Sequence, residues 1–279
     1  MRFTKMHGAG NDYVYVDLFD EAVEDAPALA RAVSDRHTGV GADGLILLKP
    51  ARDADVAMEM YNADGSRAEM CGNGIRCLAK LAFERGRSKR NPMRVATDGG
   101  PRTVALLLEE GRVTGARVDM GAPVLDPRRI PARFPGERAV DQEIDAGGRR
   151  FRATCISMGN PHAVIYVDDV ATFEVARFGP LIERHAAFPN RTNVEFVQLL
   201  NRGRVRQRTW ERGSGETQAC GTGACAVCVA GVLTGRTDSP LTSILLGGEL
   251  ELAWDGSGAV LMTGPAVEVF SGDWGGHGV

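Results

Sequence analysis

The sequence of 279 residues predicts an α+β fold with two pseudo-symmetric, strand-rich domains, each wrapped around a central helix. The first reason is that the two halves of the chain repeat one another in the same order, as duplicated units do. The second reason is that short apolar runs bounded by turn residues outnumber the helical patterns in each half. A duplication of this kind also predicts a functional site in the cleft between the two domains.

Paired segments carry the repeat along most of the chain. One such pair would mean little, but colinear pairs at similar offsets indicate duplication. The pairs are GAGNDYVYVD (8–17) with MGNPHAVIYVD (158–168), SDRH (34–37) with IERH (182–185), EMCGNGIRC (69–77) with QACGTGACA (218–226), and MGAPVL (120–125) with TGPAVE (263–268).

The repeat also sets the predicted domain boundaries. We expect a first domain at 1–122 and a second at 123–265, because the segment MGAP ends the first copy. By symmetry, the tail at 266–279 should cross back and complete the first domain. The final residues, DWGGHGV, should be frayed, as chain ends commonly are.

Each half is predicted to hold the same elements in the same order. A strand follows the Gly-Asn turn, and then come a helix, an apolar strand and a weakly alternating strand. That last strand runs into a cysteine turn, which opens a helix of small apolar residues. Two or three strands close each half, as in VALLLEEGRVTGARVDM at 104–120. The paired ranges are 14–18 and 163–167, 27–36 and 175–185, 45–48 and 194–199, 56–61 and 205–210, and 75–84 and 224–233.

The composition argues against several classes of function. A formal net charge of −3 does not favour a nucleic-acid partner or an anionic membrane. The chain has no long apolar run, and its first residues, MRFTKMHGAGND, lack the apolar core of a signal peptide. Six cysteines are too few for a disulfide scaffold, so we expect a cytoplasmic protein. Only four lysines occur, at Lys5, Lys49, Lys80 and Lys89, which leaves few candidates for a Schiff base with pyridoxal phosphate.

The two cysteine turns carry the chemistry. In each, a strand ends, a cysteine follows, and a Gly-x-Gly sequence opens a helix. Glycines permit close backbone approach, and the start of a helix attracts a carboxylate. The positive helix end should also lower the pKa of a thiol placed there. Cys71 and Cys220 therefore combine a reactive sulfur with a site for an anion.

Two such turns that face each other would place one sulfur on each side of an α-carbon. One thiolate could then remove the α-proton while the opposite thiol returns one, which is the geometry that racemisation needs. The other cysteines are expected to be buried small hydrophobes, although Cys225 and Cys228 form a C-x-x-C that would suit redox or metal chemistry. A carboxylate-binding or redox protein without turnover is the competing interpretation.

The motifs resemble those of the diaminopimelate epimerase family. The resemblance rests on GAGNDYVYVD, GVGADGLI, YNADGSRAEMCGNGIRC, MGNPHAV, RTNVEFV and WERGSGETQACGTGACA, and covers essentially the whole chain. It implies an epimerase that interconverts LL- and meso-diaminopimelate in lysine and peptidoglycan biosynthesis, without a cofactor or metal, and a homodimer. Proline racemase and hydroxyproline epimerase are similar, but their first turn reads Cys-Gly-His-Gly where Asn73 stands here.

The resemblance also implies roles for individual residues. Cys71 and Cys220 match the catalytic acid–base pair. The residues that match substrate-binding positions are Asn11, Asn62, Gly72, Asn73, Asn160, Asn193, Glu211, Arg212, Gly221 and Thr222. These types suit a substrate with two amino-carboxylate ends, since arginine binds a carboxylate and amide or carboxylate oxygens accept from an ammonium. Gly44 departs from members that have glutamine there, and His162 should lie close to the site.

Overall fold

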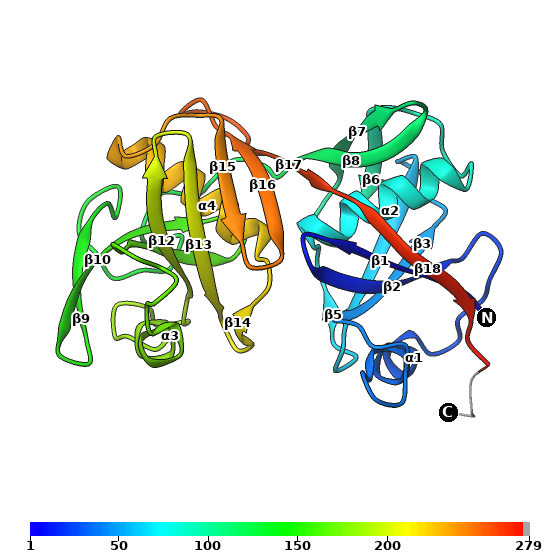
Figure 1. Cartoon of the computed structure of the whole chain (residues 1–279), viewed down its shortest axis with the longest axis horizontal. Helices are drawn as coiled ribbons and strands as arrows, with labels where there is room; N and C mark the ends of the chain where they lie inside the picture. Colours follow the sequence, from blue (N-terminus) through cyan, green and yellow to red (C-terminus); the bar gives the residue numbers. More distant parts are fainter. Residues whose placement is uncertain (276–279) are drawn as a thin grey trace. The chain divides into compact units, whose positions relative to one another are not determined.

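The computed structural model describes residues 1–275 and divides into two compact units. The first unit contains Met1–Asp119 and the chain from Thr263 on, and the second contains Met120–Met262 (Figure 1). Both divisions fall three residues before the boundaries expected after residues 122 and 265. Residues 276–279 of the expected tail lie outside the described residues. In the described part, no helix has the length and apolar character that crossing a membrane requires.

The first unit is built from strands and two helices. A parallel pair, β2 with β3, lies between antiparallel pairs, and β4 also pairs in parallel with β6. Its elements are β1 (Arg2–Gly8), β2 (Asn11–Asp17), α1 (Ala26–Ser34), β3 (Gly44–Lys49), β4 (Val56–Asn62), β5 (Arg67–Ala68), α2 (Gly72–Glu84), β6 (Met93–Ala96), β7 (Arg102–Glu109) and β8 (Arg112–Asp119).

The last part of the described chain joins this first unit. β17 (Leu261–Pro265) pairs with β8, and β18 (Val267–Asp273) runs antiparallel to β1. The close approach of β17 explains why Gly115 stands in β8, because a Cβ there would lie 2.6 Å from the carbonyl oxygen of Gly264. The N-terminal strand therefore has a partner from the opposite end of the sequence.

The second unit repeats the same pairing scheme. β11 and β12 form a parallel pair, β12 and β13 an antiparallel pair, and β13 pairs in parallel with β15. Its elements are β9 (Gln142–Ala146), β10 (Arg149–Ser157), β11 (Pro161–Tyr166), α3 (Val175–Glu183), β12 (Asn193–Asn201), β13 (Arg204–Glu211), β14 (Gly215–Thr217), α4 (Gly221–Thr234), β15 (Leu241–Leu245) and β16 (Gly248–Ala253).

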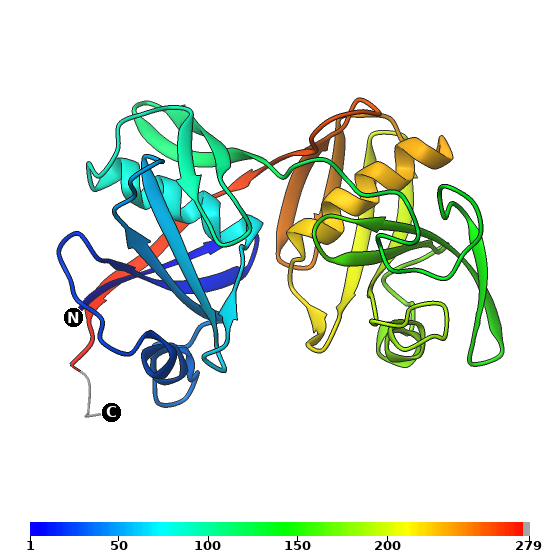
Figure 2. The same cartoon turned by 180° about the vertical axis from the view of Figure 1, so that it is seen from behind.

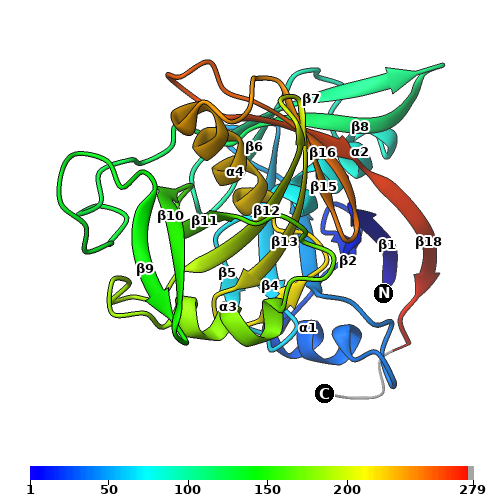
Figure 3. The same ribbon diagram turned by 60° about the vertical axis from the view of Figure 1, so that its left-hand side comes forward.

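One helix lies among the strands of each unit. The helix α2 contacts every strand from β1 to β4 and from β6 to β8, and Figure 2 shows this helix from behind. The helix α4 runs beside β10, β11 and β12 (Figure 3) and also contacts β16. Its residues are apolar all round, which is the composition of a fully surrounded helix. The predicted α+β class with a central helix in each half is confirmed.

The shorter helices α1 and α3 lie against other strands of their units. Asp25 caps α1 by accepting a hydrogen bond from the Ala28 amide at 2.9 Å, and Pro27 follows in the first turn. Both helices end two residues before the predicted positions 36 and 185. The strand β1, with its mixed sequence RFTKMHG, was not predicted, and neither was the hairpin formed by β9 and β10.

Candidate functional site

The first cysteine turn places a thiol at the start of the central helix. Cys71 is the N-cap residue of α2, with extended backbone angles φ −126° and ψ 121°. Its sulfur accepts a hydrogen bond from the Gly74 amide at 3.4 Å. A Cβ at Gly74 would lie 2.5 Å from Ile46 Cδ1, so a side chain there would have to displace Ile46. The second glycine of the motif thus lets the capped helix pack closely against β3.

Two of the predicted asparagines converge on Cys71. The thiol of Cys71 donates to Asn11 Oδ1 at 3.2 Å, and Asn73 Nδ2 lies 3.4 Å from the same oxygen. The other end of the Asn11 amide donates to Asp43 Oδ2 at 2.7 Å, which fixes the orientation of the amide. The start of β2, the start of α2 and the loop before β3 therefore meet at this thiol.

A buried arginine lies in the same helical turn. Arg76 has no exposed surface and donates to the Gly72 carbonyl and to Asn73 Oδ1, each at 3.0 Å. It also donates to the Pro265 carbonyl at 3.2 Å, which ties the returning chain to α2. Arg76 therefore holds the first turn of α2 and places a cation beneath it.

The expectation that the helix end lowers the thiol pKa was wrong for both turns. Burial raises the pKa of Cys71, and this effect outweighs the hydrogen bond from the Gly74 amide and the smaller lowering effect of Arg76. Burial raises the pKa of Cys220 well above its ordinary value, and the nearby carboxylates of Glu211 and Glu195 raise it further. Burial therefore raises the pKa of both thiols, but the charged groups near the two thiols differ in sign.

The second turn places Cys220 at the N-cap of α4. Its backbone is again extended, with φ −109° and ψ 105°, and its sulfur lies 3.5 Å from Thr222 Oγ1. A Cβ at Gly223 would lie 2.7 Å from Glu195 Oε1 and 3.3 Å from the Cys220 sulfur. Gly223 therefore leaves the room that a buried carboxylate and the thiol share.

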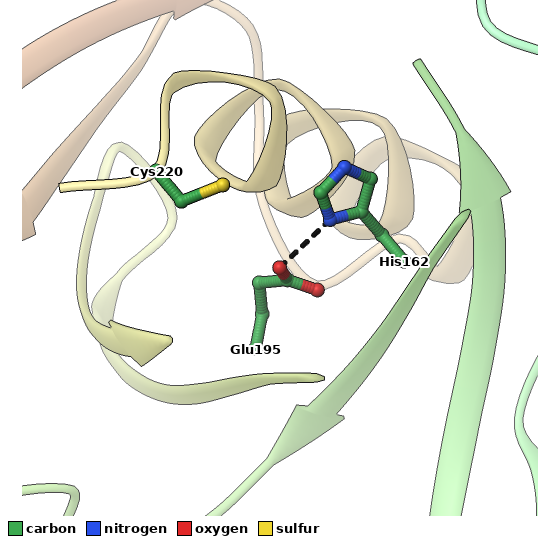
Figure 4. A group of neighbouring side chains, drawn as sticks. All are labelled: His162, Glu195 and Cys220. Atoms are coloured by element: carbon green, nitrogen blue, oxygen red, sulfur yellow. Dashed lines mark hydrogen bonds and ion pairs between the residues drawn. The ribbon is translucent and has the colours of Figure 1, made fainter. Parts of the chain in front are cut away.

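A buried histidine and glutamate lie beside Cys220. In Figure 4 the ring of His162, on β11, points at the carboxylate of Glu195, on β12. His162 Nδ1 lies 2.8 Å from Glu195 Oε1, and His162 Nε2 lies 3.0 Å from Asn160 Oδ1. The potential metal-ligand atoms of His162, Glu195 and Cys220 lie within 4.8 Å of one another. The hydrogen bond between ring and carboxylate itself accounts for the close approach of these two groups.

Glu211, at the end of β13, belongs to the same environment. Its carboxylate accepts a hydrogen bond from Thr217 at 2.5 Å. Burial raises the pKa of Glu211, against the lowering effects of Thr217 and His162. The negative charge of Glu211 in turn raises the pKa of Cys220, so the protonation of one group affects the protonation of the other.

Asn193 connects two parts of the second unit. Its Nδ2 donates to the Pro161 carbonyl at 2.8 Å, and its Oδ1 accepts from the Arg212 backbone amide at 2.8 Å. The guanidinium of Arg212 donates to the Asn190 carbonyl at 3.2 Å, and Arg212 is exposed. Asn193 thus orients the segment that presents Arg212.

Asn62 and Gly44 do not take part in the hydrogen bonds described above that join Cys71 to Asn11 and Gly74. Asn62 is exposed, and its Nδ2 donates to Ser66 Oγ at 3.0 Å. Gly44 pairs with Asn62 between β3 and β4, and a Cβ at Gly44 would lie 2.1 Å from the Tyr61 carbonyl oxygen. Gly44 therefore contributes backbone here, and a side chain would not fit without a shift of β4.

The sequence interpretation missed Arg76 and Glu195 as parts of the site. Each is a charged residue flanked by apolar neighbours, Arg76 in IRCL and Glu195 in VEFV. A charge in such a position is seldom buried without a partner, so each was a signal that could have been followed. His162, by contrast, was expected near the site and lies beside Cys220.

Each turn can therefore exchange a proton and bind an anion. A thiol stands at each helix N-cap, and backbone N–H groups of a first helical turn favour a carboxylate. Free cysteines occur at both turns, and the remaining four, Cys77, Cys155, Cys225 and Cys228, are buried. Proton transfer next to a bound carboxylate is the chemistry that these residues can supply.

Comparison with known proteins identifies the family. The family model for diaminopimelate epimerase matches residues 3–125 and 154–269. The diaminopimelate epimerase of Pelotomaculum thermopropionicum is 53% identical, over 98% of this chain and 99% of its own. That of Acetivibrio thermocellus is 50% identical, over 98% of each chain.

Solved structures share the fold at much lower identity. A probable proline racemase from Agrobacterium radiobacter matches with a TM-score of 0.73 and 18% identity, covering 98% of this chain and 92% of its own. A phenazine biosynthesis protein from Bacillus anthracis matches with a TM-score of 0.71 and 15% identity, covering 97% of each chain. The sequence matches run through both cysteine turns and nearly the whole length, and this chain belongs to the diaminopimelate epimerase family.

Proposed function

We propose that this chain interconverts LL- and meso-diaminopimelate by two-thiol acid–base catalysis, as a step in lysine and peptidoglycan biosynthesis. The observation that carries the proposal is that a cysteine caps the central helix of each repeated unit, at Cys71 and at Cys220. The two caps supply two thiols and two anion-binding helix starts, one of each from either unit.

Protons are conserved in each conversion of the substrate, because one is removed and one is returned. One cysteine, as thiolate, takes the α-proton from one face of the substrate carbon and becomes a thiol. The opposite thiol gives its proton to the other face and becomes a thiolate. The configuration is inverted, and each direction of the reaction begins with the thiolate on the opposite cysteine.

Burial serves this chemistry although it raises both thiol pKa values. The α-hydrogen of an amino acid is weakly acidic, so a thiolate of higher pKa is the stronger base for it. The carbanion needs stabilisation, which we assign to the helix starts that hold the reacting carboxylate. The backbone there belongs to Gly72 and Asn73 in one unit and to Gly221 and Thr222 in the other.

The remaining polar residues suit the second amino-carboxylate end of the substrate. We assign the carboxylate to the exposed Arg212, whose backbone amide donates to Asn193 just after the end of β13. The ammonium suits Glu211, whose carboxylate already accepts from Thr217. Asn11, Asn62 and Asn160 would contribute amide groups.

Deuterium incorporation tests the proposal. LL-diaminopimelate incubated with the protein in D₂O should gain one deuterium at an α-carbon as meso isomer forms, followed by mass spectrometry and chiral separation. Binding of diaminopimelate without any exchange would support the competing interpretation of a carboxylate-binding protein and would overturn this one. Parallel assays with proline, hydroxyproline and histidine test the substrate, since exchange with one of these alone would assign another epimerase activity.

The proposal extends to assembly and location. β18 exposes apolar side chains at Val267, Val269 and Phe270, and such a patch favours a protein partner. We propose that a second copy of this chain is that partner, which makes the protein a homodimer. We also propose a cytoplasmic location, because free cysteines suit a reducing compartment. Light scattering after size-exclusion chromatography should give twice the chain mass of 29.9 kDa. A monomer mass at micromolar concentration would contradict the homodimer.

A further inference from the structure

The repeated segment IERH at 182–185 carries a buried carboxylate that the proposed mechanism does not use. Glu183 is the last residue of α3, and its side chain is 3% exposed. Its Oε2 accepts a hydrogen bond from Trp210 Nε1 at 2.8 Å, and its Oε1 accepts one from the Gly213 backbone amide at 3.3 Å. Both donors belong to the hairpin of β13 and β14, so this carboxylate joins α3 to the hairpin.

The two hydrogen bonds fall on either side of the residues assigned to the distal end of the substrate. Trp210 directly precedes Glu211, and Gly213 directly follows Arg212. The backbone is therefore anchored immediately before and immediately after this pair of residues. Glu183 thus restricts the part of the hairpin that carries both side chains.

The helix α3 also packs directly on the Trp210 ring. A Cβ at Gly179 would lie 2.5 Å from Trp210 Cγ, so a side chain there would have to displace the indole. The contact with Gly179 holds the face of the ring, while the hydrogen bond to Glu183 directs its N–H. Trp210 is therefore fixed from two directions by one helix.

The two donors require two acceptor atoms at this position. An indole N–H and a backbone N–H can only donate, and a carboxylate offers an acceptor oxygen to each. A glutamine offers one oxygen and one NH₂ group, so one of the two N–H groups would face another donor. The guanidinium of Arg191, 3.7 Å from Glu183 Oε1, adds an ion pair from the more exposed side. Glutamate therefore suits this position and its neutral isostere does not.

The first copy of the segment has a different role. In SDRH at 34–37, Asp35 stands at the position of Glu183. Asp35 is exposed and accepts hydrogen bonds from the amides of its own loop, at 2.8 Å from His37 and 2.7 Å from Thr38. The side chain of glutamate is one methylene longer, and Glu183 reaches the hairpin instead. The difference matches the assignment of the distal-end residues to the second unit alone.

We propose that Glu183 is a positioning residue that fixes the hairpin of β13 and β14, so that Glu211 and Arg212 together match the distal amino and carboxylate groups of the substrate. These two groups are bonded to one carbon atom, so the side chains that bind them must keep a fixed separation. The inference rests on the proposed function and adds a specificity element to it. Glu183 acts through Trp210 and Gly213, from behind the residues that meet the substrate.

The first test measures the two hydrogen bonds directly and needs no turnover. The chain has three tryptophans, so a ¹⁵N spectrum contains few indole signals, and the signal lost in Trp210→Phe identifies this ring. In the wild type, the Trp210 indole N–H should exchange slowly with solvent. In Glu183→Gln, the Trp210 indole N–H or the Gly213 amide should exchange at least about tenfold faster, because one of them loses its charged acceptor. Glu174→Gln, which changes an exposed carboxylate at the start of the same helix, should leave both rates unchanged.

The second test measures the effect on the substrate. Glu183→Gln should raise KM for LL-diaminopimelate by about tenfold or more and change kcat less than KM, because the distal end of the substrate does not react. A double-mutant cycle with Arg212→Lys, which keeps a charge but loses the forked donors, separates positioning from general damage. If Glu183 acts through the hairpin, KM in the double variant should rise at least about threefold less than the product of the two single rises.

The outcomes separate this inference from the proposed function. A wild-type Trp210 indole N–H that exchanges like an exposed one overturns the inference even if Glu183→Gln does not fold. So do unchanged exchange rates in folded Glu183→Gln, an unchanged KM once the rates have changed, or a rise in KM of the double variant that equals the product. Absence of epimerisation by the wild type would remove the proposed function, while the exchange rates would still decide whether Glu183 holds the hairpin.

Discussion

The sulfur of Cys71 lies 3.2 Å from Asn11 Oδ1, and Asp43 holds the far end of that amide at 2.7 Å. The corresponding cysteine, Cys220, faces a hydroxyl and the carboxylates of Glu195 and Glu211 instead. The repeated units therefore place the same thiol in different electrostatic surroundings. Arg76 lowers the pKa of one thiol, whereas two carboxylates raise the pKa of the other.

Cys71 should be alkylated before Cys220. Only the thiolate reacts with iodoacetamide, and the pKa of Cys71 is raised less than that of Cys220. Cys71 is also the more exposed of the two residues. Peptide mass spectrometry of the ligand-free protein at pH 8 should show modification at Cys71 first, at a rate that rises with pH. Earlier modification of Cys220 would mean that the carboxylates do not control its acidity.

Replacement of Arg76 by Met should destabilise the first unit and slow alkylation of Cys71. The substitution leaves the buried Gly72 carbonyl and the partly buried Pro265 carbonyl without their guanidinium donor and should cost about 2 to 4 kcal/mol in urea unfolding. Removal of the cation also raises the pKa of Cys71, so its thiolate fraction falls. Arg76→Lys keeps the charge and should retain more of the alkylation rate than Met. Equal rates in both variants would exclude an electrostatic role for Arg76.

Gly223→Ala should impair activity more than stability. The added Cβ would meet Glu195 Oε1 at 2.7 Å and should push this carboxylate away from His162. Alanine favours a helix by about 1 kcal/mol over glycine, which offsets part of the clash in the free energy of unfolding. We expect at least about a tenfold loss of kcat/KM. Gly203→Ala, whose Cβ meets only Asn201 Oδ1 at 3.7 Å, serves as the control. Full activity of Gly223→Ala would show that this contact has no functional effect.

The buried thiols should make the protein less stable as the pH rises. Burial raises the pKa of Cys77 to about 11 and those of Cys155 and Cys228 to about 12. In the unfolded chain a thiol ionises near 8.5, so unfolding releases protons above that pH. Each such thiol should lower the free energy of unfolding by about 1.4 kcal/mol per pH unit between its unfolded and folded pKa values. Urea unfolding at pH 7.5 and pH 10 measures this loss, which should shrink in Cys155→Ala. A pH-independent free energy over this range would contradict it.

The sequence repeat predicted the fold well because duplicated units must bury equivalent faces. The cysteine turns, their central helices and the parallel pairs all follow from segments that occur twice. The strand β1 was missed because its polar residues find partners far along the chain: Lys5 donates to the Gly41 carbonyl, and the hydroxyl of Thr4 lies 3.3 Å from that of Ser271. Periodicity within a segment carries no information about such partners.

The site was predicted only in part for a related reason. Cys71 and Cys220 stand in a recognisable local pattern, whereas Arg76 and Glu195 gain their roles from residues brought near by folding. The thiol pKa values were predicted in the wrong direction because burial is a property of the folded unit. A helix start acts locally and can be predicted from the sequence, but the desolvation that outweighs it cannot.

Single replacement of each capping cysteine tests whether both thiols act on one carbon. Cys71→Ala and Cys220→Ala should each lose interconversion of LL- and meso-diaminopimelate, because either variant lacks the acid or the base for inversion. Cys155→Ala, which removes a buried thiol of β10 away from the turns, should remain active. The rate of meso isomer formed in D₂O, measured for the three variants and wild type, gives the answer. Two inactive capping variants beside an active Cys155→Ala are predicted, and near-wild-type turnover by either capping variant would contradict the two-thiol mechanism.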